Sequence, residues 1–245
     1  MHRSILTAAI AWASAAIAVA APANFTNVYV PATSIIFSAG NNANPSSFGG
    51  TNAVLADQFT SEPGRELTIS VVSGWVVCAG GGFAATGDGC AGHGTDVNSV
   101  HKISGIDASG RNGFLTGVFL GGTLPGASPA DIDYATATAY QQSLYSPQLA
   151  QVFFIGDGLT GTSSGATQTF AVPNGATRLY LGFADVQGSG SDGGSCGKDK
   201  NDGSLKVSGH ISDPGLSLAS PEPGTLVLIG LGLILVAVRR KTARE

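Results

Sequence analysis

Three of the histidines, His93, His101 and His210, lie between the two ends of the chain and could each act as a catalytic base. None of them lies in a Gly-x-Ser-x-Gly nucleophile turn or in a His-Glu-x-x-His helix, where hydrolases use such groups. Asp131 and Asp133 stand two residues apart, where solvated or helix-capping carboxylates are more typical than an acid/base pair. We therefore predict that the protein is not an enzyme.

A better candidate for chemistry is the acidic, glycine-rich segment from Leu181 to Val207. Calcium binds several hard oxygen ligands, and glycines let a loop curl around the ion. The order of residues after Asp199 is not that of an EF-hand, because the bidentate glutamate is missing. The segment predicts either a calcium loop or a polar hairpin loop; its carboxylate and amide side chains are Asp185, Asp192, Asp199, Asn201 and Asp202.

Strands are the elements that would position this loop. Leu67, Ile69 and Val71 alternate with polar residues, which is typical of a half-buried strand. Residues 131–144 could form a short helix, and residues 21–27 are expected to be loose. Together with 36 glycines, 11 prolines and 11% charged residues, the pattern predicts an all-β protein, an antiparallel β-sandwich. Further strands are expected at 97–103, 113–120, 151–155, 167–172, 178–183 and 204–211.

The two ends of the chain predict export. Arg3, an apolar run at 5–19 and the small residues Ala18 and Ala20 are typical of a signal peptide at 1–20, although cleavage could equally follow Ala18 or Ala21. The apolar residues 225–238 span about 20 Å as a helix, less than the roughly 30 Å hydrocarbon core, but their proline and arginine flanks are typical of a membrane-spanning stop-transfer segment.

These ends leave a domain at 21–212 and a linker at 213–220. The net charge of −4 provides no basic surface for nucleic acid, so we expect no nucleic-acid partner and expect membrane contact only through the C-terminal helix. Three cysteines in an exported chain predict one disulfide and one remaining thiol.

The tail at 221–245 resembles the PEP-CTERM sorting signal. The resemblance rests on Pro221, Glu222 and Pro223, the apolar run, and then Arg239 and Arg240 close to the chain end. It implies transit through the inner membrane of an exopolysaccharide-producing bacterium and processing by an exosortase. It also implies a final place at the cell surface or in the extracellular matrix.

The core is similar to the calcium-dependent galactophilic lectins of the PA-I type, a galactose-binding, jelly-roll-like sandwich. The similarity rests on Phe183-Ala184-Asp185, on Asn201-Asp202-Gly203-Ser204, and on Gly74-Trp75 followed by Cys78. By that resemblance, Ca²⁺ would be held by the side chains of Asp185, Asn201 and Asp202 and by the carbonyls of Cys78 and Ser189. Asp88 and His93 would contact the sugar. The chain departs from those lectins in a longer calcium loop and in Cys78 and Ala184, which stand where they have Tyr and Asn.

If Cys78 lies beside the calcium, Cys196 could reach it; alternatively Cys78 pairs with Cys90. The sequence predicts an exported, calcium-dependent carbohydrate-binding module whose partner is extracellular polysaccharide. One alternative is a structural surface or biofilm matrix protein without a ligand. The other is a polysaccharide hydrolase, which would need carboxylates such as Asp131, Asp133 and Asp157 to converge.

Overall fold

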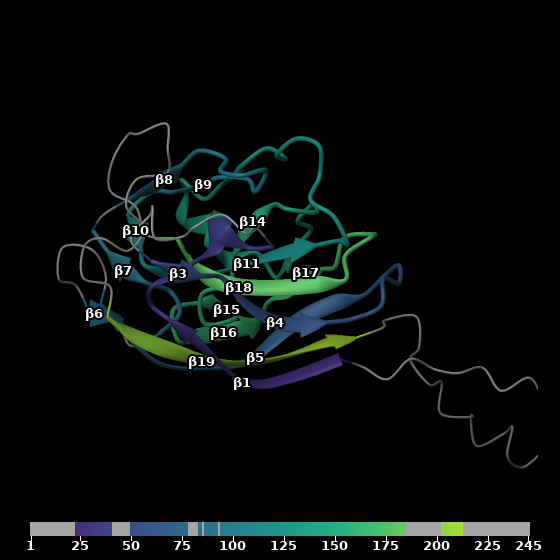
Figure 1. Ribbon diagram of the computed structural model, residues 1–245. Helices are drawn as coiled ribbons and strands as arrows, with labels where there is room; N and C mark the ends of the chain where they lie inside the picture. Colours follow the sequence, from purple (N-terminus) through teal and green to yellow (C-terminus); the bar gives the residue numbers. More distant parts are fainter. Residues whose placement is uncertain are drawn as a thin grey trace, which may run out of the picture.

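Two β-sheets packed face to face form the core of the protein (Figure 1). The computed structural model describes residues 23–40, 50–77, 83–84, 86–92, 94–184 and 202–212. The described residues form strands, turns and short 3-10 helices, and no α-helix occurs among them. The predicted all-β sandwich is confirmed, but it is not wholly antiparallel, because several of its short strands pair in parallel.

The first sheet is built around two long antiparallel strands, β5 (Glu66–Val77) and β19 (Gly203–Ser212). Strand β1 (Ala23–Pro31) covers the other edge of β19. Beyond β5 the order continues through β17 (Thr169–Ala171) to β13 (Leu144–Tyr145), and β6 (Phe83–Ala84) pairs with the end of β5. The predicted strands at 67–77, 167–172 and 204–211 lie in this sheet.

Strand β1 shows that the expectation of a loose start was wrong for residues 23–27. Phe25 is 5% exposed and lies opposite Gly209 of β19. A Cβ at Gly209 would lie only 2.4 Å from the Phe25 ring, so the glycine makes room for the ring. Burial of Phe25 and Val30 removes apolar surface from water, which holds this segment on the sheet.

The second sheet has the order β14 (Val152–Phe154), β11 (Phe114–Leu120), β18 (Arg178–Ala184), β2 (Ser34–Ile35) and β3 (Thr51–Asn52). Strand β4 (Val54–Gln58) also pairs with β18. Every residue of β11 and β14 is buried. The ring centroids of Phe153 on β14 and Phe170 on β17 lie 5.0 Å apart, so aromatic packing joins the two sheets.

Several short strands and 3-10 helices lie outside the two main sheets. A three-stranded sheet has the order β12 (Ile132–Asp133), β9 (Ile106–Ala108), β8 (Thr95–Val97). Strand β10 (Arg111–Asn112) pairs with β7 (Cys90–Ala91), and β15 (Leu159–Gly161) forms a hairpin with β16 (Ser164–Thr167). The 3-10 helices η1 (Ile36–Ser38) and η3 (Ala137–Gln141) complete the set that bears on the core and the pocket.

Two predicted elements differ in the structure. The strand expected at 97–103 ends at Val97, and the chain then turns at His101 and Lys102, which take left-handed backbone angles with φ of 50° and 71°. This turn brings Val100 and Ile103 into contact with each other as an isolated bridge. Residues 131–144 form β12, η3 and the start of β13, and not one short helix.

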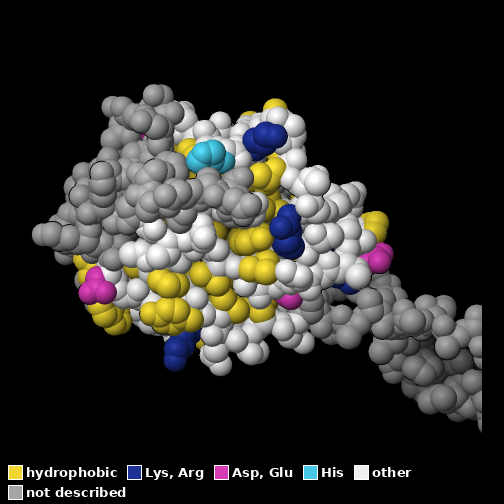
Figure 2. Space-filling view, viewed as in Figure 1, with side chains coloured by type: hydrophobic (Ala, Val, Ile, Leu, Met, Phe, Trp, Pro, Cys, Tyr) yellow, Lys and Arg dark blue, Asp and Glu magenta, His cyan; other side chains and the backbone are white. Residues whose placement is uncertain are grey.

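The predicted signal peptide, linker and sorting tail lie outside the described residues. Within the described part of the chain, no helix is long and apolar enough to cross a membrane. Charged side chains are sparse on the described surface seen in Figure 2, in keeping with 11% charged residues in the sequence.

Candidate binding pocket

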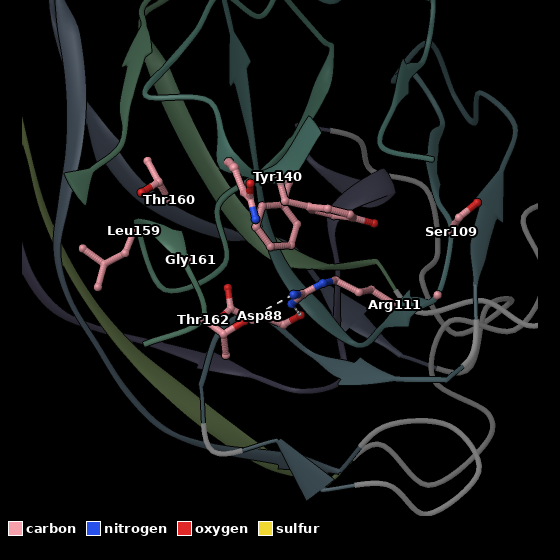
Figure 3. A pocket seen from close by; sticks show the side chains of 11 residues that line it. Asp88, Ser109, Arg111, Tyr140, Leu159, Thr160, Gly161 and Thr162 are labelled. Atoms are coloured by element: carbon pink, nitrogen blue, oxygen red, sulfur yellow. Dashed lines mark hydrogen bonds between the residues drawn. The ribbon is translucent and has the colours of Figure 1, made fainter. Parts of the chain in front are cut away.

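A cavity of about 210 Å³ lies between the turn before β7, strand β10, helix η3 and the β15–β16 hairpin (Figure 3). These segments are far apart in the sequence and meet only in the folded chain. The polar side chains that line the cavity are Asp88, Ser109, Arg111, Gln141, Thr160 and Thr162, and the rings of Tyr140 and Phe154 form its apolar wall.

Arg111 is the cation of this pocket. Its Nη1 donates to the backbone carbonyl of Asp88 at 3.0 Å, and its Nη2 donates to Thr162 Oγ1 at 3.3 Å. Its Cζ lies 5.0 Å from the centroid of the Tyr140 ring, a cation–π contact. A guanidinium carries five N–H groups, so it keeps donors for a ligand after these two bonds.

The β7–β10 pairing places Arg111 next to Asp88. Arg111 lies opposite Ala91, and Asn112 lies opposite Cys90, two residues beyond Asp88. Cys90 is 9% exposed and disulfide-bonded; its partner, Cys78 or Cys196, lies outside the described residues. The disulfide therefore fixes the strand against which Arg111 pairs.

Asp88 is a buried carboxyl that joins two turns. It is 4% exposed, and its Oδ1 accepts the backbone N–H of Asp157 at 3.3 Å while its Oδ2 accepts the Thr86 hydroxyl at 3.3 Å. Burial, and then the negative charge of Asp157, raises the pKa of Asp88 to about 6, although Arg111 and the hydrogen bonds act in the opposite direction. At neutral pH this carboxyl is thus mostly ionised but easily protonated.

Glycines let the two turns touch through their backbones. Gly156 has a φ of +60°, and a Cβ there would lie 2.4 Å from Asp88 Oδ1. A Cβ at Gly87 would lie 1.9 Å from the Gly156 carbonyl oxygen. Asp157 then orders the neighbouring hairpin, because its carboxylate accepts the N–H groups of Leu159 at 2.9 Å and Ser163 at 2.6 Å.

Tyr140 forms the aromatic wall from helix η3. Its ring centroid lies 4.8 Å from Phe154, edge to face, and 5.3 Å from Tyr134, stacked. Its hydroxyl is buried and has no hydrogen-bond partner among the described residues. Burial raises the pKa of Tyr140 to about 12, so it stays neutral at physiological pH.

The structure places the predicted site residues unequally. Asp88, expected to contact a sugar, lines the cavity, whereas His93 lies outside the described residues. Four of the predicted calcium ligands also lie outside the described residues: Asp185, Asn201, Cys78 and Ser189. Asp202 is exposed just before β19, and its Oδ1 accepts the Gly203 N–H at 2.7 Å. In the described part of the chain no group of three or more His, Cys, Asp and Glu could hold a metal ion.

The carboxylates considered for a hydrolase have different neighbours. Asp131 accepts the N–H of Gly105 at 2.6 Å, and Asp133 lies on β12 opposite Asp107 of β9. Asp157 lies in a different place, beside Asp88. The repulsion of Asp133, Asp96 and Asp131 adds to burial in raising the pKa of Asp107. These carboxylates therefore form two separate groups.

Arg111, Tyr140 and Thr162 are pocket residues that sequence reasoning missed. Arg111 follows Ser109-Gly110, a turn signal that marks a loop but does not say what the loop faces. Tyr140 lies within residues 131–144, for which the sequence predicts a short helix and no binding role. Only the tertiary fold brings these side chains to Asp88.

Comparison with known proteins identifies the tail. The chain is an exported protein that carries a C-terminal sorting signal. That signal is the PEP-CTERM protein-sorting motif, which matches residues 221–241 and so includes Pro221, Glu222, Pro223, Arg239 and Arg240. The motif implies membrane-associated transit and processing by exosortase-type machinery. No curated protein and no solved structure matches the chain, and the resemblance of the core to PA-I lectins stays a prediction.

Proposed function

We propose that the protein is an exported carbohydrate-binding module that holds one sugar residue in the pocket beside Arg111. The observation that carries the proposal is the combination in one cavity of a guanidinium with spare donors, a buried carboxyl, threonine hydroxyls and aromatic rings. Sugar hydroxyls both donate and accept hydrogen bonds, and their C–H faces pack on aromatic rings. Its place of action is the cell surface or the extracellular polysaccharide matrix.

The size and charge of the cavity favour a single neutral sugar. Drug-sized ligands occupy pockets of roughly 300–1,000 Å³, and this cavity of about 210 Å³ is smaller. The charge of Arg111 acts on the carboxyl of Asp88, which also lies near Asp157, so the pocket has no excess of positive charge to attract an acidic sugar. A neutral ring with several hydroxyls fits both constraints.

The hydrogen bonds of Asp88 and Asp157 support a binding role for the pocket and not a catalytic one. Both oxygens of Asp88 accept hydrogen bonds, one from Thr86 in its own turn and one from Asp157 in the other turn, and both oxygens of Asp157 accept N–H groups of the β15–β16 hairpin. These bonds hold the two carboxyls in structural roles, in which they shape the pocket wall. We therefore propose a binding protein and not a hydrolase.

We also propose that a calcium ion with a structural role binds just before β19. Asp202 supports it, because its carboxylate is exposed and only one of its oxygens is bonded within the described residues. Carboxylate oxygens are preferred calcium ligands. The remaining ligands would be Asp185, Asn201 and the carbonyls of Cys78 and Ser189, as the lectin resemblance implies.

Titration calorimetry of the full-length protein with galactose, glucose and mannose tests the sugar pocket. We expect one of these sugars to bind, and Arg111→Gln to weaken binding at least about tenfold, since it removes a charged donor and the contact with Tyr140. Lys102→Gln, an exposed cation elsewhere, is the matched control. If none of the sugars binds, or if Arg111→Gln binds as the parent protein does, the pocket is not a sugar site and a structural role is favoured.

Thermal melting with increasing calcium tests the ion. The melting temperature should rise with calcium and fall back on chelation, and Asp202→Asn should reduce the rise. Asp96→Asn, a second exposed carboxylate, should leave the response unchanged. If the melting temperature does not change with calcium, the proposed calcium site is wrong, and the proposed sugar site at Arg111 is unaffected.

A further inference from the structure

The outer face of the first sheet carries three of the large exposed hydrophobic side chains. Tyr29 on β1 is 57% exposed, Val71 on β5 is 49% exposed and Trp75 on β5 is 41% exposed. In Figure 1 this sheet is the lower layer, and no labelled strand lies beneath it. We call the outward-facing residues of β1, β19 and β5 the outer face.

The strand register sets these side chains in rows. Tyr29 lies opposite Lys206, and Lys206 lies opposite Ser73, so the three form one row across β1, β19 and β5. The next row is Pro31, Ser204 and Trp75. Two strand spacings separate β1 from β5 by about 10 Å, and two residues along a strand add about 7 Å. Tyr29 and Trp75 therefore lie at opposite corners of an extended platform.

Lys206 gives this platform its charge. The side chain is exposed at the centre of the first row, and it pairs with no carboxylate of the described residues. The chain as a whole has a net charge of −4, so a lone ammonium between two hydrophobic corners is a local exception. A ligand with a carboxylate beside an apolar surface complements it.

Hydroxyl groups fill the space between the hydrophobic side chains. Ser73 and Ser204 lie in the same rows as Lys206 and Trp75, and each offers a donor and an acceptor, whereas the hydroxyl of Ser208 already accepts the N–H of Asn27 at 3.0 Å. The core of a stable protein interface is largely apolar and poor in charge, which this surface is not. A two-fold dimer through the face would also bring the two copies of Lys206 close together. A second copy of the chain is therefore the poorer partner.

We infer that the outer face binds an extended polysaccharide that carries carboxylate groups. Sugar rings would lie on Tyr29 and Trp75, their hydroxyls would bond to the serines, and a uronate carboxylate would pair with Lys206. This site is separate from the Arg111 pocket, shares no residue with it and takes a polymer where the pocket takes one neutral sugar. It does not depend on the proposed function.

Affinity electrophoresis of the full-length protein in gels that contain polygalacturonate, an acidic polymer, or dextran, a neutral one, tests the inference. We expect retardation by polygalacturonate only, and retardation that weakens as salt rises because a charge pair contributes. Tyr29→Ala and Lys206→Gln should each lower the affinity about tenfold. Leu55→Ala, which trims a 40% exposed side chain of the other sheet, should leave it unchanged.

Arg111→Gln separates this site from the pocket, because it should not change retardation by polygalacturonate. No retardation, equal retardation by dextran, or retardation lost in Arg111→Gln but kept in Tyr29→Ala would each overturn the inference. Self-association that Tyr29→Ala abolishes, without any polymer binding, would assign the face to a second copy instead. A melting temperature within about 2 °C of the parent, roughly 1 kcal/mol or less for a domain of this size, shows that the variants are folded.

Discussion

The backbone N–H of Asp157 donates to the carboxylate of Asp88 at 3.3 Å and ties together two turns that are 69 residues apart in the sequence. One turn leads into β7, and the other leads into the β15–β16 hairpin. The pocket opens between the elements that these turns position, so its shape depends on a single buried carboxyl.

Asp88→Asn should remove a pH dependence of stability. The pKa of about 6 in the folded protein lies above the ordinary 3.8, so the folded state holds this proton more tightly than the unfolded chain does. The stabilisation that protonation provides is complete below the ordinary pKa and is lost as pH rises through about 6, a change of roughly 3 kcal/mol at most.

Urea unfolding at about pH 4.5 and about pH 8 measures this effect. At the higher pH we expect the variant to be more stable than the parent, since an asparagine Oδ1 can accept the N–H of Asp157 and its amide N–H can donate to Thr86 Oγ1. Glu62→Gln, at an exposed position, serves as the control. Parallel pH profiles for the parent and Asp88→Asn would contradict the assignment.

Tyr134→Phe should destabilise the core. The Tyr134 hydroxyl is fully buried and accepts the backbone N–H of Phe154 at 3.1 Å, and its loss would leave that N–H without a partner, at a cost of about 1–3 kcal/mol. Tyr140→Phe is a matched control in the adjacent stacked ring, because its buried hydroxyl has no partner among the described residues. Denaturant unfolding of both variants should show a clear loss for the first and little change for the second; equal losses would show that the bond to Phe154 is not what matters.

Gly156→Ala should destabilise the protein and disturb the pocket. The left-handed backbone, with φ of +60°, costs a non-glycine residue about 1 kcal/mol or more. The added Cβ would also lie 2.4 Å from Asp88 Oδ1 and force the two turns apart. Gly122→Ala, where a Cβ meets nothing within 4 Å, is the control. Calorimetric melting measures the stability of both variants. If Gly156→Ala is as stable as Gly122→Ala, the close approach of Gly156 to Asp88 is not a constraint on the fold.

Arg111→Lys should weaken sugar binding although it keeps the positive charge. The guanidinium spans two acceptors, the Asp88 carbonyl and Thr162 Oγ1, and lies over the Tyr140 ring, which an ammonium on a flexible chain does not reproduce. We expect affinity for the bound sugar to fall about tenfold in titration calorimetry. Full retention of affinity would mean that charge alone, and not the planar fork, holds the ligand.

Long strands could be predicted from the sequence, and short ones could not. Alternation over residues 67–71 predicts β5, and similar patterns predict β11, β18 and β19. The two- and three-residue strands β7, β8, β10 and β12 have no period to detect, because tertiary contacts and not local patterning select them. Asp88 could be predicted as a site residue only through a resemblance, and Arg111 not at all, since its partners come from turns 23 and 51 residues away in the chain.

The pairing of β1 with β19 also sets the order of events in folding. These strands meet at Ala23 and Ile211, near the two ends of the described chain, so β1 cannot join the first sheet until β19, which lies between β1 and β5, has been made. Such distant pairing makes folding slow and leaves strand edges open in the meantime. A chain that must first be threaded through a translocation channel gains from this delay, because the sandwich closes only after almost all of its sequence has crossed.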